Sequence, residues 1–181
     1  MAHRWPPGTV FSLDGITPQI HKSAFVAPGA VIIGDVTIGE DTGIWFHVLI
    51  RGDMNIIRIG ARTNIQDSVM VHVDSGGAAT MIGDDVTIGH NAVIHGCVLK
   101  NRAFVGIGAT VLDGAVIEEG GMLAAGGLLT PGKMIGPNEM WTGSPAKLRR
   151  VMDEDERKRF DRNAIVYRDL AKRFIAGLKE V

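Results

Sequence analysis

A large apolar residue returns every six positions through most of this chain. The first run consists of Ile20, Val26, Ile32, Ile38, Ile44, Ile50 and Ile56. After two phase shifts and one five-residue step, the same spacing continues to Trp141. An amphipathic helix cannot produce this pattern, because its apolar stripe recurs every 3.6 residues. A six-residue unit does fit a short strand followed by a tight corner.

The composition agrees with many corners between short strands. Glycine accounts for 24 of 181 residues, well above the roughly 7% of average proteins. We expect glycine to provide corners with φ > 0 where it directly follows the apolar residue, as at Gly39, Gly60, Gly83, Gly89 and Gly106. Three six-residue units make one triangular coil, and coils stack at about 4.8 Å through parallel ladders. The sequence therefore predicts a mainly β chain folded as a parallel β-helix, rather than a β-sandwich with coincidental spacing.

The spacing changes near the C-terminus. Apolar residues three or four positions apart indicate an amphipathic helix, and they are Phe160, Ala164, Tyr167, Ala171, Phe174 and Leu178. Asp153 and Glu156 stand in capping-box positions at its start. We predict a β-helix domain over residues 1–147, with a lead-in over 1–19, and a C-terminal helix over 148–181. This helix should pack along the coil or across a neighbouring chain.

Bulk properties exclude several classes of function. The formal net charge is −1, so no basic excess exists to neutralise nucleic-acid phosphates. No apolar run reaches membrane-spanning length. Cys97 is the single cysteine, which rules out an internal disulfide and indicates a reducing compartment. We expect a cytoplasmic protein without nucleic-acid or membrane partners.

Three histidines have a spacing that predicts a shared metal site. His72 and His95 occupy equivalent positions and fall on one face, one coil apart, if residues 74–79 bulge out as a loop. His90 lies on the preceding face and should point away from this pair. Catalytic zinc takes three protein ligands, and a neighbouring copy could offer His90 in a closed three-fold ring. The other histidines fit no such arrangement and are expected to be ordinary corner or surface residues: His3, His21 and His47.

Several motifs add a family resemblance to this pattern. They are Leu13-Asp14-Gly15, Ile50-Arg51-Gly52-Asp53, Asn64-Ile65-Gln66-Asp67, Val71-His72, Gly89-His90, His95-Gly96-Cys97, Val105-Gly106-Ile107-Gly108-Ala109 and Gly143-Ser144-Pro145-Ala146-Lys147. From about Leu13 to Leu178 the chain resembles the γ-class carbonic anhydrase family of hexapeptide-repeat proteins, and its short bacterial branch in particular. The resemblance implies a left-handed coil, an exception to the usual right-handed crossover. It also implies a homotrimer in which His72 and His95 of one subunit and His90 of the next bind zinc, iron or cobalt.

The resemblance further implies roles for five residues around that metal. Arg51 and Asp53 would support subunit contacts at the site. Gln66 would hydrogen-bond the metal-bound water or hydroxide, with Asn64 behind it. Tyr167 would line the pocket.

The expected reaction is reversible hydration of CO2 to bicarbonate. A metal held by three histidines lowers the pKa of bound water to about 7, and the hydroxide attacks CO2. The most active members of the family carry a glutamate where this chain has Met54, and an acidic loop where this chain has only Asp74. Methionine cannot relay a proton. We therefore predict intact metal binding with slow or conditional hydratase activity.

Three alternative functions stay open from the sequence. A CoA-dependent acyltransferase would share the coil and the segment Gly143–Lys147. An acyl-CoA thioesterase would use the same hydroxide on an acyl-CoA carbonyl. A non-catalytic protein would use the metal only to join the trimer. Protection by coenzyme A, hydrolysis of acyl-CoAs, and dissociation without turnover would distinguish them.

Overall fold

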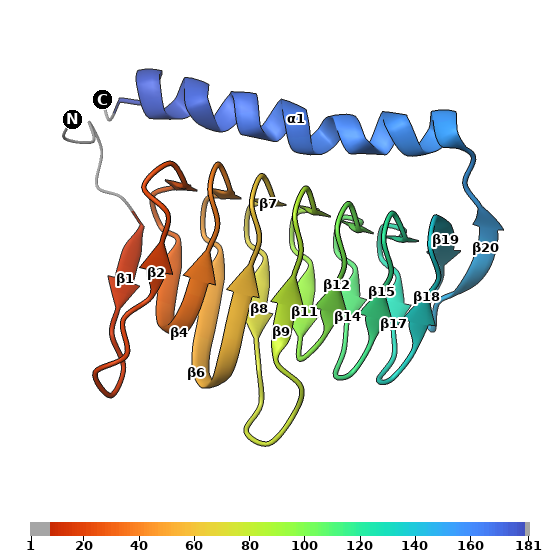
Figure 1. Cartoon of the computed structure of the whole chain (residues 1–181), viewed down its shortest axis with the longest axis horizontal. Coiled ribbons are helices and arrows are strands. Elements are labelled where there is room, and N and C mark those ends of the chain that lie inside the picture. Colours follow the sequence, from red (N-terminus) through yellow and green to blue (C-terminus); the bar gives the residue numbers. More distant parts are fainter. Residues whose placement is uncertain (1–7, 180–181) are drawn as a thin grey trace.

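The computed structural model describes residues 8–179, which form a parallel β-helix with one α-helix along its side (Figure 1). This arrangement confirms the predicted mainly β fold class. Residues 1–7 of the predicted lead-in, with His3, and residues 180–181 of the predicted helical segment lie outside the described part. The one helix of the described part does not combine the length and the apolarity that crossing a bilayer requires.

Each coil contributes one short strand to each of three faces. The first face contains β1 (Thr9–Phe11), the first parts of β4 (Val31–Ile38) and β6 (Leu49–Ile59), β8 (Met70–His72), β11 (Val93–His95), β14 (Thr110–Val111) and β17 (Leu128–Leu129). The second face contains β2 (Gln19–Ile20), the later parts of β4 and β6, β9 (Thr80–Ile82), β12 (Val98–Leu99), β15 (Val116–Ile117) and β18 (Met134–Ile135). The third face contains β3 (Phe25–Val26), β5 (Gly43–Ile44), β7 (Asn64–Ile65), β10 (Thr87–Ile88), β13 (Phe104–Val105), β16 (Met122–Leu123) and β19 (Glu139–Thr142).

The residues of the six-residue spacing point into the coil and stack on one another. On the first face, the register partners Ile32, Ile50, Val71, Ile94, Val111 and Leu129 are all buried. The assignment of Ile56 to this inward-pointing series was wrong, because Ile56 is partly exposed and Ile57 is buried in its place. Between the register pairs Gly34–Gly52 and Val36–Ile57, β6 has more residues than β4. The offset between register partners rises there from 18 residues (Ile32 and Ile50) to 21 residues (Ile38 and Ile59), so a three-residue insertion produces the first phase shift in the apolar spacing.

The glycines after the apolar positions are required by close stacking, not by left-handed backbone. None of the five predicted corner glycines has a positive φ. A Cβ at Gly39 would lie 2.6 Å from the carbonyl carbon of Gly60, and one at Gly106 would lie 2.3 Å from the amide nitrogen of Ala125. Neighbouring coils therefore touch backbone to backbone at these points. The left-handed corners fall on other residues, such as Asp41 with φ 51°.

The helix α1 (Glu154–Gly177) covers the third face (Figure 1). Its capping box is the predicted one, since Asp153 accepts from the backbone N–H of Glu156 and Glu156 bonds back to Asp153. Its apolar face packs on an aromatic cluster around Trp45. The ring centroid of Trp45 lies 5.3 Å from the ring centroids of both Tyr167 and Phe174, which belong to α1. The helix thus packs on the coil of its own chain.

A buried arginine anchors the first turns of α1 to the coil. Arg157 is 6% exposed, and its guanidinium donates to the carbonyl oxygen of Gly120 at 2.9 Å. It also pairs with Asp161 one turn further along the helix. These contacts fix the position of α1 relative to the third face.

The segment between coil and helix forms a strand that the sequence did not predict. β20 (Lys147–Val151) pairs antiparallel with β19 and is exposed along its whole length. This strand occupies the start of the segment predicted as the C-terminal helix over 148–181, and the helix itself begins at Glu154.

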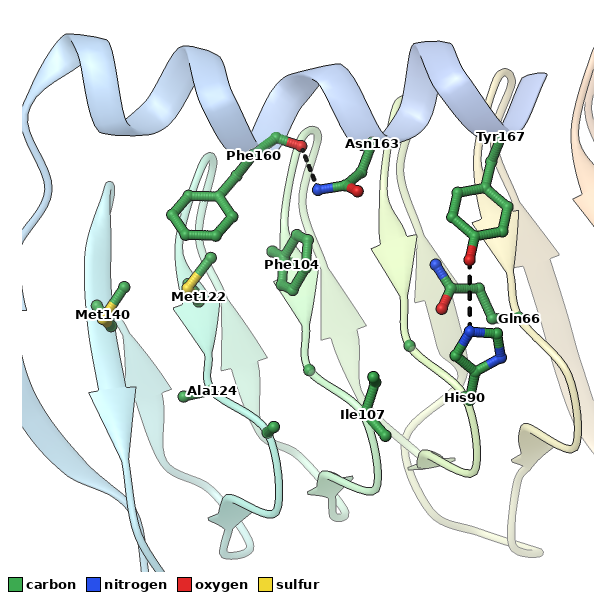
Figure 2. Close-up of a pocket in the computed structure, with 13 residues that line it drawn as sticks. Gln66, His90, Phe104, Ile107, Met122, Ala124, Met140, Phe160, Asn163 and Tyr167 are labelled. Atoms are coloured by element: carbon green, nitrogen blue, oxygen red, sulfur yellow. Dashed lines mark hydrogen bonds between the residues drawn. The ribbon is translucent and has the colours of Figure 1, made fainter. Parts of the chain in front are cut away.

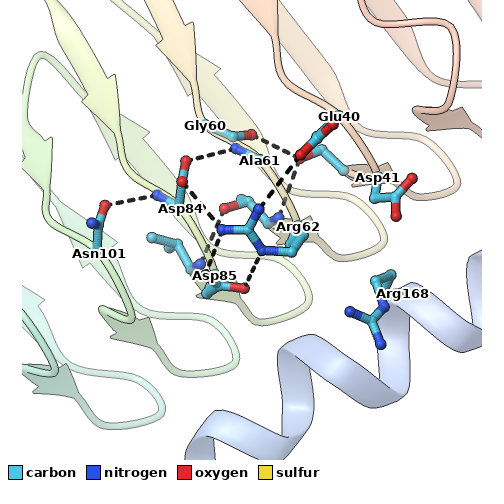
Figure 3. Close-up of polar contacts among 12 residues, drawn as sticks. Glu40, Asp41, Gly60, Ala61, Arg62, Asp84, Asp85, Asn101 and Arg168 are labelled. Atoms are coloured by element: carbon cyan, nitrogen blue, oxygen red, sulfur yellow. Dashed lines mark hydrogen bonds and ion pairs between the residues drawn. The ribbon is translucent and has the colours of Figure 1, made fainter.

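A ladder of charges follows the corner between the second and third faces (Figure 3). The Arg62 guanidinium donates to Asp85 at 2.9 Å and to Asp84 at 3.2 Å in the next coil, and it lies 3.7 Å from Glu40 in the preceding one. Asp84 also accepts from the backbone N–H of Ala61 at 2.8 Å. These contacts tie three successive corners together.

Candidate metal centre

Two of the three predicted ligands lie opposite each other on neighbouring coils of the first face. His72 and His95 end β8 and β11 and are register partners. The Nδ1 atom of His72 lies 3.1 Å from the Nε2 atom of His95. Both side chains point outward because the residues before them, Val71 and Ile94, point into the core. The strand spacing therefore brings these two imidazoles together.

A carboxylate contacts the other ring nitrogen of each imidazole. An Asp53 oxygen lies 3.0 Å from Nε2 of His72, and an Asp113 oxygen lies 2.9 Å from Nδ1 of His95. Asp53 also pairs with Arg51, the register partner of His72 in the preceding coil. Partial burial opposes ionisation of Asp53, but hydrogen bonds from Arg51 and His72 outweigh it and hold its pKa below the ordinary value. We call Arg51, Asp53, His72, His95 and Asp113 the paired-histidine half.

The donor set of the paired-histidine half suits a divalent transition metal. Two imidazole nitrogens bound to a tetrahedral ion at about 2.1 Å lie about 3.4 Å from each other. The distance found between His72 and His95 is 3.1 Å. A carboxylate on the remote nitrogen of a ligating histidine fixes its tautomer and orientation. The residues therefore fit the metal that the resemblance implies.

The third predicted ligand, His90, lies at the corner between the third and first faces. Its Nδ1 atom is 2.8 Å from a carboxylate oxygen of Asp67. Its Nε2 atom is 3.4 Å from the hydroxyl oxygen of Tyr167, which reaches down from α1 (Figure 2). Burial, together with the charge of Asp67, raises the pKa of the Tyr167 phenol, which therefore stays protonated at neutral pH.

Two buried amides lie on the coil before His90. Asn64 donates to the hydroxyl of Thr87 at 2.9 Å and accepts from Nε2 of Gln66 at 3.1 Å. These bonds hold the Gln66 amide beside His90, where Figure 2 shows both side chains at one end of a pocket. We call Asn64, Gln66, Asp67, His90 and Tyr167 the single-histidine half.

The two halves do not meet within one chain. His90 precedes the first face and His95 ends it, so the strand residues Val93 and Ile94 lie between them. Over residues 8–179, no hydrogen bond or ion pair links His90 with His72 or His95. Each chain therefore presents two separate parts of the predicted site, at opposite edges of the first face.

The loop between β8 and β9 adds an acid to the paired-histidine half. Asp74, His95 and Asp113 each offer an atom that could bind a metal, and these atoms all lie within 4.8 Å of one another. Met54, at the adjoining corner of β6, is 54% exposed. Asp74, the single acid of this loop, therefore lies beside a predicted ligand.

A pocket of about 450 Å³ lies between α1 and the third face, beside the single-histidine half (Figure 2). Gln66, His90 and Tyr167 form one end of it. The rest of the lining is mostly apolar and includes Phe104, Ile107, Met122, Ala124, Met140 and Phe160.

Sequence reasoning missed Asp67 and Asp113 as partners of the histidines. Asp113 follows His95 by 18 residues, one regular coil. Asp67 precedes His90 by the same 23-residue offset that separates His72 from His95. Both contacts, Asp113 with His95 and Asp67 with His90, could have been predicted from the spacing between successive coils. The other two histidines of the described part have local contacts, since His21 pairs with Ser23 and the His47 ring packs over Gly29.

Comparisons with known proteins agree with this architecture. Residues 17–52 match the bacterial transferase hexapeptide (six repeats) family. Over 169 residues the chain is 44% identical to γ carbonic anhydrase 2, a mitochondrial protein of Arabidopsis thaliana, covering 91% of this chain and 61% of that protein. It is 46% identical over 153 residues to a carbonic anhydrase of Geobacillus kaustophilus, covering 84% of each. The crystal structure of a hexapeptide transferase family protein from Anaplasma phagocytophilum has a TM-score of 0.86 and 45% identity, covering 91% of this chain and 97% of that one.

The fold and the repeat define a hexapeptide-repeat β-helix protein. Within that class, the identity and coverage show that the chain belongs to the γ-class carbonic anhydrase family. It spans less than two thirds of the length of the plant relative.

Proposed function

We propose that the protein is a metal-dependent carbonic anhydrase, which interconverts CO2 and bicarbonate at sites formed between the chains of a homotrimer. The observation that supports this most strongly is the 3.1 Å approach of the His72 and His95 ring nitrogens, each imidazole backed by a carboxylate. Relatives of the chain carry the name carbonic anhydrase. Zinc is the expected metal, with iron or cobalt as alternatives.

The position of the two halves favours a ring of copies. The single-histidine half stands at one edge of the first face and the paired-histidine half at the other. Contact between unlike edges of successive copies closes into a ring when each copy turns by one third of a circle. The outward positions of the first face are largely apolar, as an interface between copies requires, and are occupied by Val31, Leu49, Met70, Val93, Thr110 and Leu128.

The residues around the site have separate tasks in this proposal. His72, His95 and the partner's His90 would hold a divalent cation, which lowers the pKa of a water molecule to about 7 and so supplies a nucleophile at neutral pH. Asp53 and Asp113 keep two of the imidazoles oriented. Gln66, held by Asn64, presents its amide to an oxygen atom at the site, and the protonated phenol of Tyr167 can donate a second hydrogen bond.

Turnover also requires a proton to leave for the buffer. Met54 cannot transfer it, although it follows Asp53 directly. Asp74 can, because its carboxylate lies in the group with His95 and Asp113 and its residue is exposed to solvent. We assign proton exit to Asp74. A single exposed acid is a sparse route, and we expect hydration to be slow or dependent on buffer.

Metal content and solution mass test the proposal directly. Protein purified without chelator should contain one metal per chain and have the mass of three chains by light scattering. His72→Ala and His90→Ala should each remove the metal, whereas the control His21→Ala should retain it. A monomer, or metal content that survives both His72→Ala and His90→Ala, would refute the proposed site.

Stopped-flow hydration of CO2 by the metal-loaded protein then separates catalysis from assembly. A rate above that of buffer that disappears in His90→Ala supports the enzyme. Metal removal that splits the trimer of a protein without any hydration rate would instead establish a metal that only joins the subunits.

A further inference from the structure

The pocket beside His90 is far larger than CO2 requires. Its volume of about 450 Å³ is that of roughly fifteen water molecules at liquid density, whereas CO2 has three heavy atoms. The pocket is also one-sided. Three polar side chains, Gln66, His90 and Tyr167, gather at one end, and Asn163 of α1 lies further along. Figure 2 shows the opposite end lined by Met122, Met140 and Phe160.

The apolar part of the pocket follows the stacking of the coils. Phe104, Met122 and Met140 are register partners on β13, β16 and β19, and all three line the pocket beneath α1. From the coil of His90 to the coil of Met140 there are three ladder spacings, about 14 Å in total. Phe160 of α1 packs edge-on against Phe104, with the two ring centroids 5.3 Å apart. The strip is therefore long, apolar and covered by the helix.

CO2 and a carboxylic ester present the same kind of electrophile. In each, a carbon doubly bonded to oxygen accepts the oxygen of a water molecule. An ester differs in carrying a chain on that carbon, and a pocket that is polar at one end and apolar along its length suits such a molecule.

We propose that the site also hydrolyses carboxylic esters and thioesters with an unbranched apolar acyl chain. The chain lies along Phe104, Met122 and Met140, and the carbonyl lies at the Gln66, His90 and Tyr167 end. The inference rests on the proposed function, because the attacking water is activated at the metal centre. Water adds to the carbonyl carbon, the bond from that carbon to the ester oxygen or sulfur breaks with its electron pair, and the leaving group takes a proton. The products are a carboxylic acid and an alcohol or thiol.

Binding of a series of neutral amides tests the pocket without any turnover. From acetamide to octanamide, affinity measured by calorimetry or ligand-observed NMR should rise about fourfold for each added methylene. Ala124→Phe places a ring into the strip and should abolish this dependence on chain length. Ala176→Phe is the matched control, because Ala176 is exposed on α1 and does not line the pocket. Affinity that stays flat along the series in the folded parent protein would overturn the inference.

Hydrolysis of p-nitrophenyl esters tests the chemistry. The octanoate should exceed the acetate in kcat/KM by at least about tenfold in the parent and in Ala176→Phe, and the ratio should fall toward one in Ala124→Phe. A protein that binds metal and hydrates CO2 but shows a ratio near one in the parent refutes this inference alone. A graded amide series in a protein that takes up no metal refutes the proposed function, and the hydrolysis with it.

Discussion

The hydroxyl oxygen of Tyr167 lies 3.4 Å from the Nε2 atom of His90, which stands 77 residues earlier in the chain. The C-terminal helix and a corner of the coil therefore both contribute to the single-histidine half. The helix covers the third face and at the same time brings a phenol to the predicted metal ligand.

Replacing Tyr167 by Phe tests the importance of this phenol. The ring should keep its packing against Trp45, so metal content and fold should be unchanged. Loss of one hydrogen bond to the reacting oxygen should lower kcat/KM for CO2 about threefold to tenfold. Stopped-flow assays with metal analysis of the same sample provide the measurement. Unchanged kcat/KM would show that the phenol makes no contact with the reacting oxygen.

Mixing two inactive variants tests whether one site takes ligands from two chains. In a trimer that contains both His72→Ala and His90→Ala chains, one interface has a complete ligand set. There the His90→Ala chain supplies an intact His72 and His95, and the His72→Ala chain supplies an intact His90. Random assembly of equal amounts should restore about one quarter of the parent metal content. Metal analysis of co-expressed, separately tagged chains measures this. If no metal returns in the mixed trimers, the ligands come from a single chain.

Asp74→Asn tests the route for proton exit. The amide cannot accept a proton at neutral pH, so we expect kcat for CO2 hydration to fall by about tenfold to a hundredfold in dilute buffer. Addition of imidazole buffer should restore most of the loss, because the buffer takes the proton directly. A loss that imidazole cannot restore would point to damage at the metal centre.

The converse substitution, Met54→Glu, adds a proton-accepting side chain directly after Asp53. It should therefore raise kcat for CO2 hydration in dilute buffer. Met134→Glu is its matched control, because both methionines are 54% exposed and Met134 lies in β18, away from the histidines. An equal effect of the two substitutions would reflect added charge alone.

Arg157→Ala should loosen the helix from the coil. The substitution removes a hydrogen bond from a charged donor to the Gly120 carbonyl and leaves Asp161 without this partner. We expect a loss of about 2–3 kcal/mol in the free energy of unfolding, measured by urea denaturation. Arg159→Ala, on the exposed side of α1, should change it by less than about 0.5 kcal/mol. Equal effects of the two substitutions would show that the buried contacts are not what hold α1.

Cys97 should make stability depend on alkaline pH. Burial raises the pKa of its thiol from 9.0 to about 12, so between these values the folded chain keeps a proton that the unfolded chain has lost. The contribution of Cys97 to the free energy of unfolding therefore falls by about 1.4 kcal/mol per pH unit above pH 9. Urea denaturation at pH 8, 9 and 10 should show the parent losing this amount relative to Cys97→Ala. A constant difference between the two proteins would contradict the shift.

The features that the sequence predicted depend on local or strictly periodic signals. The Asp153 capping box and the apolar face of α1 need only neighbouring residues to form. The coil places His72 beside His95 because equivalent positions in successive coils are register partners.

The features that the sequence missed depend on contacts between distant segments. β20 forms only because β19 offers an edge. The need for glycine at Gly39 comes from the backbone of Gly60 in the next coil, which a reading of local backbone preferences does not include. Asn163 was missed as a pocket residue because its place opposite the third face depends on how α1 docks.

The direction of β20 bears on how the solenoid ends. Parallel coils leave an unpaired edge at each end, and such an edge could recruit the first coil of another molecule and extend into a fibre. On the third face, the outermost strand at the C-terminal end is β20, which runs antiparallel to β19, so the strand of an incoming coil would meet a neighbour of opposite polarity on that face. These five residues thereby end the parallel stack on one of its three faces.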